Sequence, residues 1–327
     1  MNSWTQWVGA LFGGHPSPSR AAAPPCGVDV RRSSPSACVT PVAAATPSAE
    51  AAAGVDTLAA FFGWLAGPGS VRPVPLSPPE QRLLRQLDSV LSNDAARAGL
   101  LPRTPAVVPQ LMNSLRGGRH SVQTLAQHVA KDANLVAEVI RLASSVHSSA
   151  DRPVADLADA IRRLGTDGLR QVIAKVVLKP IFDAPAHSLS GRAAPRLWVH
   201  AEAQARAGIE LAAASGLDPF EAFVAALMHN SGWSAALRVI DRAEGGAPAH
   251  FSEAFVRACD ARRELFFARL VRPWQLNAQL TLLADALLHG RAMADAGPLG
   301  QLLGVADRTA TRTVVPHREE ALSSPTV

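Results

Sequence analysis

The stretch Phe223–Trp233 reads FVAALMHNSGW: six consecutive apolar residues lead into the pair His229-Asn230, which Ser231-Gly232 follows. An apolar run of this kind, without turn residues, is typical of a buried helix. Asn and Gly tolerate the left-handed backbone in which many helices end, so Asn230 fits a helix C-terminal turn. The stretch therefore predicts a buried helical core with an imidazole and an amide at the end of a helix.

The sequence on both sides of this stretch repeats helical signals. Ser77-Pro78-Pro79-Glu80 is typical of a helix start, because Pro is tolerated in the first turn and Glu at N3 can complete a capping box. Gly165 ends one apolar helical pattern, and Thr166 can cap the next. No apolar-polar alternation flanked by turn signals indicates a strand. The sequence predicts an all-α fold, with long helical segments at about 193–214, 219–243, 251–271 and 275–289.

The chain is expected to have four parts: an arm over residues 1–76, a leading helix over 77–100, a helical domain over 101–292, and a short helix with a disordered tail over 293–327. Within the arm, residues 15–54 are rich in Pro, Ala and Ser and should be disordered, because they bury too little apolar surface to offset their ordering entropy. Two short apolar islands, at 4–12 and 58–65, flank this segment. They either dock loosely on the domain or stay disordered, since helices this short are marginal alone. The alternative is an anchor for a partner or a membrane surface.

Composition narrows the class of protein. The net charge is +5 over 327 residues, and basic residues cluster only in pairs, whereas nucleic-acid-binding domains concentrate charge in a stripe. The three cysteines are widely spaced and give no zinc spacing. No signal peptide is visible, and no apolar run approaches the roughly twenty residues of a membrane span. We therefore expect a cytoplasmic protein with no cofactor, no transmembrane segment and no nucleic-acid partner.

Six segments, taken in order, carry a family pattern. They are Leu101–Pro105 (Leu-Pro-x-x-Pro), Lys131–Ser145 (Asp-x-x-Leu and Leu-x-Leu-Ala), Val154–Gly165 (Ala-Ile-x-x-Leu-Gly), Leu197–His200 (Trp-x-His), Ala226–Gly232 (Leu-x-His) and Trp274–Asn277 (Trp-x-Leu). Together they resemble the HDOD domain, a relative of the HD phosphohydrolases found in bacterial signalling proteins. The chain departs from the family at Ala133, Ser144 and Asn277, and above all at Asn230, where the family has Asp. The resemblance implies an HD-like helical core with a second helical subdomain, and a regulatory role rather than a catalytic one.

The resemblance also implies where a metal would be held. An active HD site needs two or more His and two Asp around the cation, and His200 and His229 stand at the two histidine positions. At Asn230 an amide replaces the carboxylate, although a hard cation prefers anionic oxygen. We therefore expect these three residues to be vestigial, with no catalytic residue and no metal ligand. Each histidine is expected to be buried beside a backbone partner.

Residues farther along the chain support the same expectation. Asp241 and Asp260 lie downstream of the His-Asn pair, yet neither falls at a convincing position for the last ligand. Arg263 stands where many members of the resembled family carry another His. A guanidinium at that position would repel a cation. Hydrolytic metal chemistry is therefore not the expected function.

Three functions remain open at this point. The first is a non-catalytic signal-transduction module that binds a protein partner. The second is a sensor that holds a nucleotide or another small anion in the former metal pocket. Arg262, Arg263 and Arg269 motivate it, because guanidinium groups pair well with phosphate. The third is a residual metal-dependent phosphohydrolase that uses His200 and His229.

Overall fold

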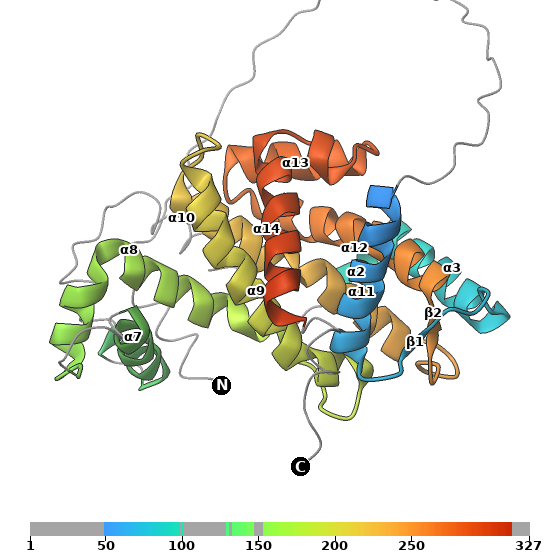
Figure 1. Ribbon diagram of the computed structural model, residues 1–327, viewed down its shortest axis with the longest axis horizontal. Helices are drawn as coiled ribbons and strands as arrows, with labels where there is room; N and C mark the ends of the chain where they lie inside the picture. The colour runs from blue at the N-terminus through green and yellow to red at the C-terminus, as the bar shows by residue number, and fades with distance from the viewer. Residues whose placement is uncertain (1–48, 99, 101–128, 131–132, 147–152, 316–327) are drawn as a thin grey trace, which may run out of the picture. The chain divides into compact units, whose positions relative to one another are not determined.

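The computed structural model describes residues 49–98, 100, 129–130, 133–146 and 153–315 (Figure 1). The expected features at 4–12 and 101–128 lie outside these residues, as does the tail beyond 315. Helices make up most of the described chain, and its two strands have two residues each, so the predicted all-α class is confirmed. None of these helices combines the length and the apolar character that a membrane crossing needs.

The helices of eight residues or more are α2 (Ala49–Ala66), α3 (Pro78–Ser92), α7 (Ala133–Val146), α8 (Leu157–Leu178), α9 (Leu189–Ala212), α10 (Pro219–His229), α11 (Ser231–Asp241), α12 (Glu253–Val271), α13 (Ala278–Leu288) and α14 (Pro298–Val314). A short α4 (Asp94–Ala98) follows α3, and 3-10 turns span Lys179–Phe182, Arg272–Trp274 and Met293–Asp295. Two strands of two residues, β1 (Val71–Arg72) and β2 (Phe251–Ser252), pair in parallel with Val71 opposite Phe251.

In two places a short sequence signal starts or breaks a helix where the sequence analysis predicts it. At α3 the capping box is present: Glu80 N–H donates to Ser77 Oγ (3.4 Å), and Ser77 N–H donates to the Glu80 carboxylate (2.6 Å). The second carboxylate oxygen of Glu80 accepts from Ser252 N–H (2.5 Å), so this buried acid also joins α3 to the start of α12. Gly165 has φ +64° and breaks the helical backbone within α8, as its position before Thr166 predicts.

The helix end at Asn230 differs from the prediction. Asn230 has φ −69° and ψ −7°, which is right-handed, and α11 begins at once at Ser231. Gly232 also has no positive φ. It is needed for space, because a Cβ there would lie 2.2 Å from the carbonyl oxygen of Arg263 on α12. The small residue therefore serves the close approach of α11 to α12 rather than a left-handed turn.

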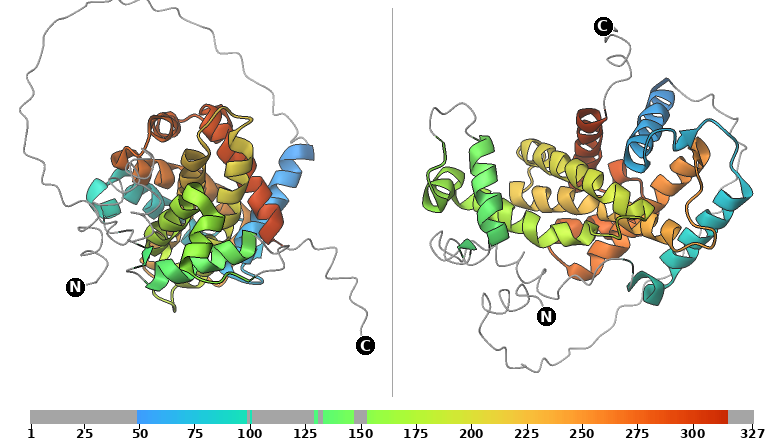
Figure 2. Two further views of the ribbon diagram at one scale, coloured as in Figure 1. Left: turned by 90° about the vertical axis from the view of Figure 1, so that its left-hand side faces the viewer. Right: turned by 90° about the horizontal axis from the view of Figure 1, so that it is seen from below.

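The core is built around α9, which packs most extensively against α10 and α14, while α11 packs against α12. Helices α7 and α8 pack mainly against each other, and they meet the rest through α10 and through ion pairs of Arg141 and Lys175 with Glu202 of α9. Figures 1 and 2 place this pair on one side of the central helices and α2 and α3 on the other.

Helix α2 is longer and better packed than the sequence suggests. It begins at Ala49, inside the segment 15–54 predicted to be disordered, and the island at 58–65 is its last two turns. Phe61, Phe62 and Leu65 are exposed by only 3, 0 and 0%. The Phe62 ring meets Phe251 edge-on at 5.2 Å. Loose docking is therefore wrong for this island: aromatic residues far along the chain supply the surface that buries it.

Helix α14 is longer than the short helix expected after residue 292. It spans 17 residues, from Pro298 to Val314. It buries one apolar face against α9 and α10, made of Leu299, Leu302, Leu303, Ala306 and Ala310. This helix completes the centre of the domain.

Candidate functional site

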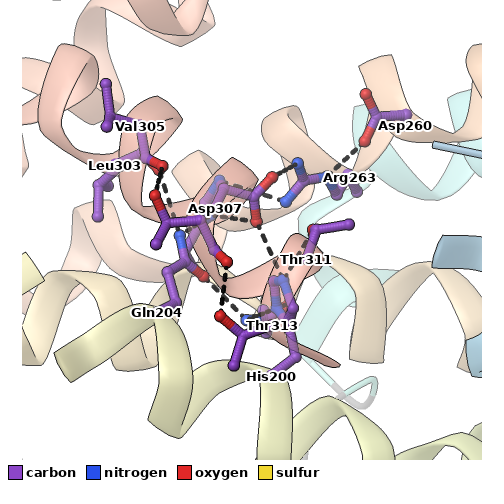
Figure 3. Close-up of polar contacts among 12 residues, drawn as sticks. His200, Gln204, Asp260, Arg263, Leu303, Val305, Asp307, Thr311 and Thr313 are labelled. Carbon is purple, nitrogen blue, oxygen red and sulfur yellow. Dashed lines mark hydrogen bonds and ion pairs between the residues drawn. The ribbon is translucent and has the colours of Figure 1, made fainter. Parts of the chain in front are cut away.

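The two histidines and the asparagine of the family pattern meet inside the helical core. His200 projects from the middle of α9, His229 is the last residue of α10, and Asn230 joins α10 to α11. Their exposed fractions are 0, 1 and 0%. Figure 3 shows His200 beside Gln204 of the same helix and Asp307 of α14. Three segments that are distant in sequence therefore converge on one buried polar cluster.

Hydrogen bonds link the three residues through Gln204, which is one helical turn from His200. Asn230 donates from Nδ2 to Gln204 Oε1 (3.0 Å), and Gln204 donates from Nε2 to His229 Nδ1 (2.8 Å). The same Asn230 nitrogen lies 3.0 Å from His200 Nδ1, and its amide oxygen lies 3.2 Å away. An amide nitrogen carries two hydrogens, so Asn230 can donate to both partners. This network assigns both rings as acceptors at Nδ1, with their hydrogen on Nε2.

Each Nε2–H then finds an acceptor on another helix. His200 Nε2 lies 3.1 Å from Thr311 Oγ1, and His229 Nε2 lies 3.2 Å from Glu264 Oε2. Burial lowers the pKa of His200 and outweighs the nearby Asp307 carboxylate, which raises it, so this ring is neutral at pH 7. The histidines are buried as expected, but these partners are side chains rather than the backbone groups predicted for them.

Arg263 occupies the acidic side of the cluster, where it meets four groups. It is 5% exposed, and its Nε donates to Asp260 Oδ1 (2.6 Å). Its Nη2 lies 3.0 Å from Asp307 Oδ2 and 3.2 Å from Glu264 Oε1. Its Nη1 lies 3.3 Å from His229 Nε2, so two N–H groups face each other there. One permanent cation is thus held by three carboxyl groups.

The pKa values around Arg263 show which partner dominates. Burial raises the pKa of Asp307, but the guanidinium, helped by the two imidazoles, lowers it to about 2. Glu264 follows the same balance: burial is outweighed by Arg263 and then His229, and its pKa falls. The pKa of Asp260 rises instead, because its burial outweighs its contact with the guanidinium. Arg263 itself has a pKa well above its ordinary value, since the carboxylates overcome its burial.

The residues present do not fit a bound metal ion. Among the described residues, no group of three or more His, Cys, Asp or Glu side chains is arranged to hold one. The four candidate donors, His200, His229, Glu264 and Asp307, lie around the Arg263 guanidinium or one contact away. A guanidinium has no lone pair for a metal and repels a cation at contact distance. No metal-dependent step follows from this arrangement.

Aromatic side chains close the histidine side of the cluster. The Phe61 ring of α2 lies 4.6 Å from the His200 ring, centre to centre, and Phe267 meets His229 edge-on at 5.1 Å. The partly exposed members of the cluster are acids: the Glu264 and Asp307 side chains are exposed by 20 and 22%. An approaching molecule therefore meets carboxylates before it meets an imidazole.

The other predicted residues lie in different surroundings. Arg262 pairs with Asp88 of α3 through two contacts of 2.7 Å, and Arg269 lies on the exposed surface of α12. The structure therefore brings Arg263 to the histidines but does not join it with Arg262 and Arg269 in one pocket. Asp241 accepts from Leu189 N–H (2.8 Å) and from the next amide, so it fixes the start of α9.

Sequence reasoning missed Asp307 and Thr311, because both lie in the segment expected to end in a tail. A signal was available. The apolar residues of α14 recur at helical spacing, and Asp307 and Thr311 are four residues apart, which places them on one helix face. Gln204 and Glu264 carried no such signal, since their role depends on helices that meet only in the fold.

Comparison with known proteins adds a family and a fold. The HDOD domain family model matches residues 101–284, more than half of the chain. The search of curated proteins returns no match. One similar solved structure is an HDOD domain protein of unknown function from Geobacter sulfurreducens, 22% identical over 73% of this chain and 82% of that one, with a TM-score of 0.49.

Two further solved structures are similar to this chain. One, named "Putative metal-dependent phosphohydrolase", comes from Shewanella amazonensis SB2B; it is 18% identical over 70% of this chain and 82% of that one, with a TM-score of 0.51. The other, named "Putative signal transduction protein", comes from Marinobacter aquaeolei VT8; it is 19% identical over 72% of this chain and 65% of that one, with a TM-score of 0.42. At these identities a likeness concerns the fold alone.

Proposed function

We propose a function from one premise: the chain belongs to the HDOD domain family. It serves a signalling-related role as a non-catalytic regulatory module, and it acts by binding a protein partner through its helical domain. The observation that carries this proposal is the internal pairing of the polar cluster. His200, His229 and Asn230 are buried, and their polar atoms meet partners within the chain.

A reaction centre needs a polar group that is free to meet the substrate. Here the imidazole nitrogens are engaged by Gln204, Asn230, Thr311 and Glu264, and an aromatic ring of α2 lies against His200. Breaking such buried contacts costs about 1 to 3 kcal/mol for each group left unsatisfied. The arrangement of the cluster therefore favours a structural role for it. The protein surface is then the place where a partner binds.

The charge at the cluster argues against the two alternatives. A phosphate of a nucleotide or a phosphodiester would first meet Glu264 and Asp307, which repel it. Arg263 lies behind them and already pairs with both. A residual phosphohydrolase would in addition need a cation where the guanidinium lies. The geometry thus supports the binding of a protein partner rather than anion sensing or phosphate hydrolysis.

The experiment has two arms, both on the full chain. In the first, in-cell cross-linking followed by affinity purification compares wild type with Val199→Asp and Leu282→Asp, which alter side chains exposed by 50 and 63% on α9 and α13. We expect one protein to be recovered in near-equal amount with wild type, and to be lost with one of the two variants. A chain that purifies alone under all conditions counts against partner binding.

The second arm measures hydrolysis of phosphomonoesters and phosphodiesters with Mn²⁺ present. We expect the rate to equal the rate without protein. Hydrolysis that follows the protein peak through gel filtration, and that Asn230→Ala abolishes, refutes the non-catalytic assignment.

A further inference from the structure

We infer that a cleft between α8 and α9 binds a nucleoside monophosphate, with Arg206 holding its phosphate and Gln171 pairing with the edge of its base. The inference goes beyond the proposed function, because it concerns a small ligand. It stands whether or not a protein partner is found.

The size and lining of the cleft are the first argument. Its volume is about 620 Å³, within the roughly 300 to 1,000 Å³ of small-molecule sites. Four of its side chains are apolar and come from α7, α8, α9 and α10, namely Leu142, Leu164, Ile209 and Phe223. Apolar walls of this kind suit the faces of a flat ring. The cleft thus has the size and the surface for the organic part of a nucleotide.

The cleft is separate from the histidine cluster, although α9 contributes to both. Glu202, Arg206 and Ile209 line the cleft, and they follow His200 by two, six and nine positions. With about 3.6 residues per turn, these positions lie roughly 180 to 240° around the helix from His200. The two faces of α9 therefore point in nearly opposite directions, one to the cluster and one to the cleft.

Charge in the cleft favours an anion. The lining has three basic and two acidic side chains: Arg163, Lys175, Arg206, Asp167 and Glu202. Asp167 Oδ1 lies 3.1 Å from Arg170 Nη1, and Glu202 Oε1 lies 2.8 Å from Lys175 Nζ, so both acids are already paired. Arg206 has no ion pair with any residue that the structure describes. A guanidinium without a counter-ion, at the side of a cleft, suits the bidentate pairing that phosphate offers.

A buried ammonium adds to this positive charge. Lys175 is 8% exposed, and its ammonium has three hydrogens, of which the ion pair with Glu202 uses one. The Arg141 guanidinium of α7 also approaches Glu202, with Nη2 at 3.6 Å from Oε1. Two cations thus share one carboxylate at this end of the cleft. An anionic ligand balances the excess charge.

Gln171 decides which kind of organic anion fits. Its side chain is half-buried on the α8 wall, and within the described part of the chain its amide has no hydrogen-bond partner. Buried amides are normally paired, and a glutamine amide can donate and accept at the edge of a base such as adenine. An acyl chain would leave Gln171 unpaired, and inorganic phosphate would leave the apolar walls wet. A nucleoside monophosphate satisfies both.

The test is isothermal titration of the full chain with AMP, GMP, CMP and UMP. We expect at least one of them to bind with a 1:1 stoichiometry and a Kd of about 1 mM or below. The matching nucleoside, which lacks the phosphate, and ribose 5-phosphate, which lacks the base, should each bind at least about tenfold more weakly. The inference is overturned if no nucleotide saturates, or if inorganic phosphate or decanoate binds as tightly as the best nucleotide.

Two variants locate the ligand in the cleft and separate its two ends. Arg206→Gln should weaken the nucleotide at least about tenfold and leave the affinity for the nucleoside unchanged. Gln171→Leu should weaken the nucleotide and leave the affinity for ribose 5-phosphate unchanged. The matched control is Arg192→Gln, at another exposed arginine of α9, which donates to the His187 carbonyl oxygen (2.9 Å). It should bind like wild type. A nucleotide affinity that survives Arg206→Gln, or that falls equally in Arg192→Gln, contradicts the assignment.

Hydrogen exchange gives a readout that does not depend on any variant. Bound nucleotide should slow amide exchange in residues 168–175 of α8 and 202–209 of α9, because a ligand that spans both helices suppresses their local opening. Residues 278–288 of α13 do not line the cleft and serve as the internal control. Protection that appears elsewhere but not along α8 and α9 overturns the inference.

Discussion

Asn230→Asp restores the carboxylate of a His-Asp pair, and the structure predicts a damaged protein rather than a repaired metal site. The substitution keeps the shape of the side chain and exchanges a double donor for an acceptor. Asn230 Nδ2 now lies 3.0 Å from Gln204 Oε1 and 3.0 Å from His200 Nδ1, both of which act as acceptors. A carboxylate at this place therefore faces two acceptors in a pocket with 0% exposure. Arg263 remains where it is, so no metal is gained.

The cost arises because the substitution removes two donated hydrogen bonds inside the core. A buried unsatisfied polar group costs about 1 to 3 kcal/mol, so we expect a loss of about 3 kcal/mol in the free energy of unfolding at pH 7. That is roughly a 150-fold change in the folded-to-unfolded ratio. Burial raises the pKa of an introduced carboxyl above its unfolded value, so the native variant binds the extra proton more readily. The penalty is then fully present at neutral pH and shrinks as the pH falls toward about 4.

Urea unfolding of both proteins at pH 7 and pH 4.5 measures these effects. The matched control is Asn277→Asp, which is also buried but uses only its oxygen, to accept from Leu280 N–H as a helix cap (2.6 Å). Asp caps a helix as well as Asn, so this control should lose less than about 0.5 kcal/mol. The reasoning is refuted if Asn230→Asp is as stable as wild type at pH 7, or if its loss grows as the pH falls.

Three further predictions concern the packing around the cluster. Phe62 is 0% exposed, so Phe62→Ala should lower the free energy of unfolding in urea by about 3 to 5 kcal/mol. Leu282 is 63% exposed, so Leu282→Ala should lower it by less than about 0.5 kcal/mol. Equal losses would show that α2 is not docked. The pKa of Asp307, held at about 2 by Arg263 against its burial, gives stability that is present above the unfolded pKa and lost as the pH falls through about 2. Asp307→Asn should therefore flatten the decline of the thermal midpoint between pH 5 and pH 2 by an amount worth about 2 kcal/mol, and an unchanged acid profile contradicts this. Gly232→Ala places a Cβ 2.2 Å from the Arg263 carbonyl oxygen and should lower the free energy of unfolding by about 3 kcal/mol or more. The thermal midpoint, measured by circular dichroism, should then fall by about 10 °C or more. An unchanged midpoint would refute the close helix contact.

Local patterns predicted what depends on local physics. The capping box at Ser77 and the break at Gly165 follow from a few neighbouring residues, and both are found where the sequence places them. The all-α class follows from helical periodicity, which extends over long segments. The family motifs placed His200 and His229 on helices that meet.

Non-local packing explains what the sequence did not reveal. The apolar island at 58–65 does not by itself reveal that it is buried. Phe61 and Phe62 pack against Trp233 and Phe251, which lie almost two hundred residues away in the sequence. Asp307 looked like a tail residue, since nothing near it in sequence indicates a cation. Asp307 belongs to the cluster because Arg263, on another helix, contacts its carboxylate.

The contact between Arg263 and Asp307 also sets an order of events during synthesis. The two residues are 44 positions apart, with Arg263 made first. At about 5 to 20 residues per second, a ribosome needs roughly 2 to 9 seconds to reach the partner acid. During that interval the nascent chain has both histidines and the guanidinium but lacks the helix that completes their neutralisation. The cluster must therefore be among the last parts of the domain to close, and a ribosome that stalls between these two positions would expose an incomplete core to chaperones and proteases.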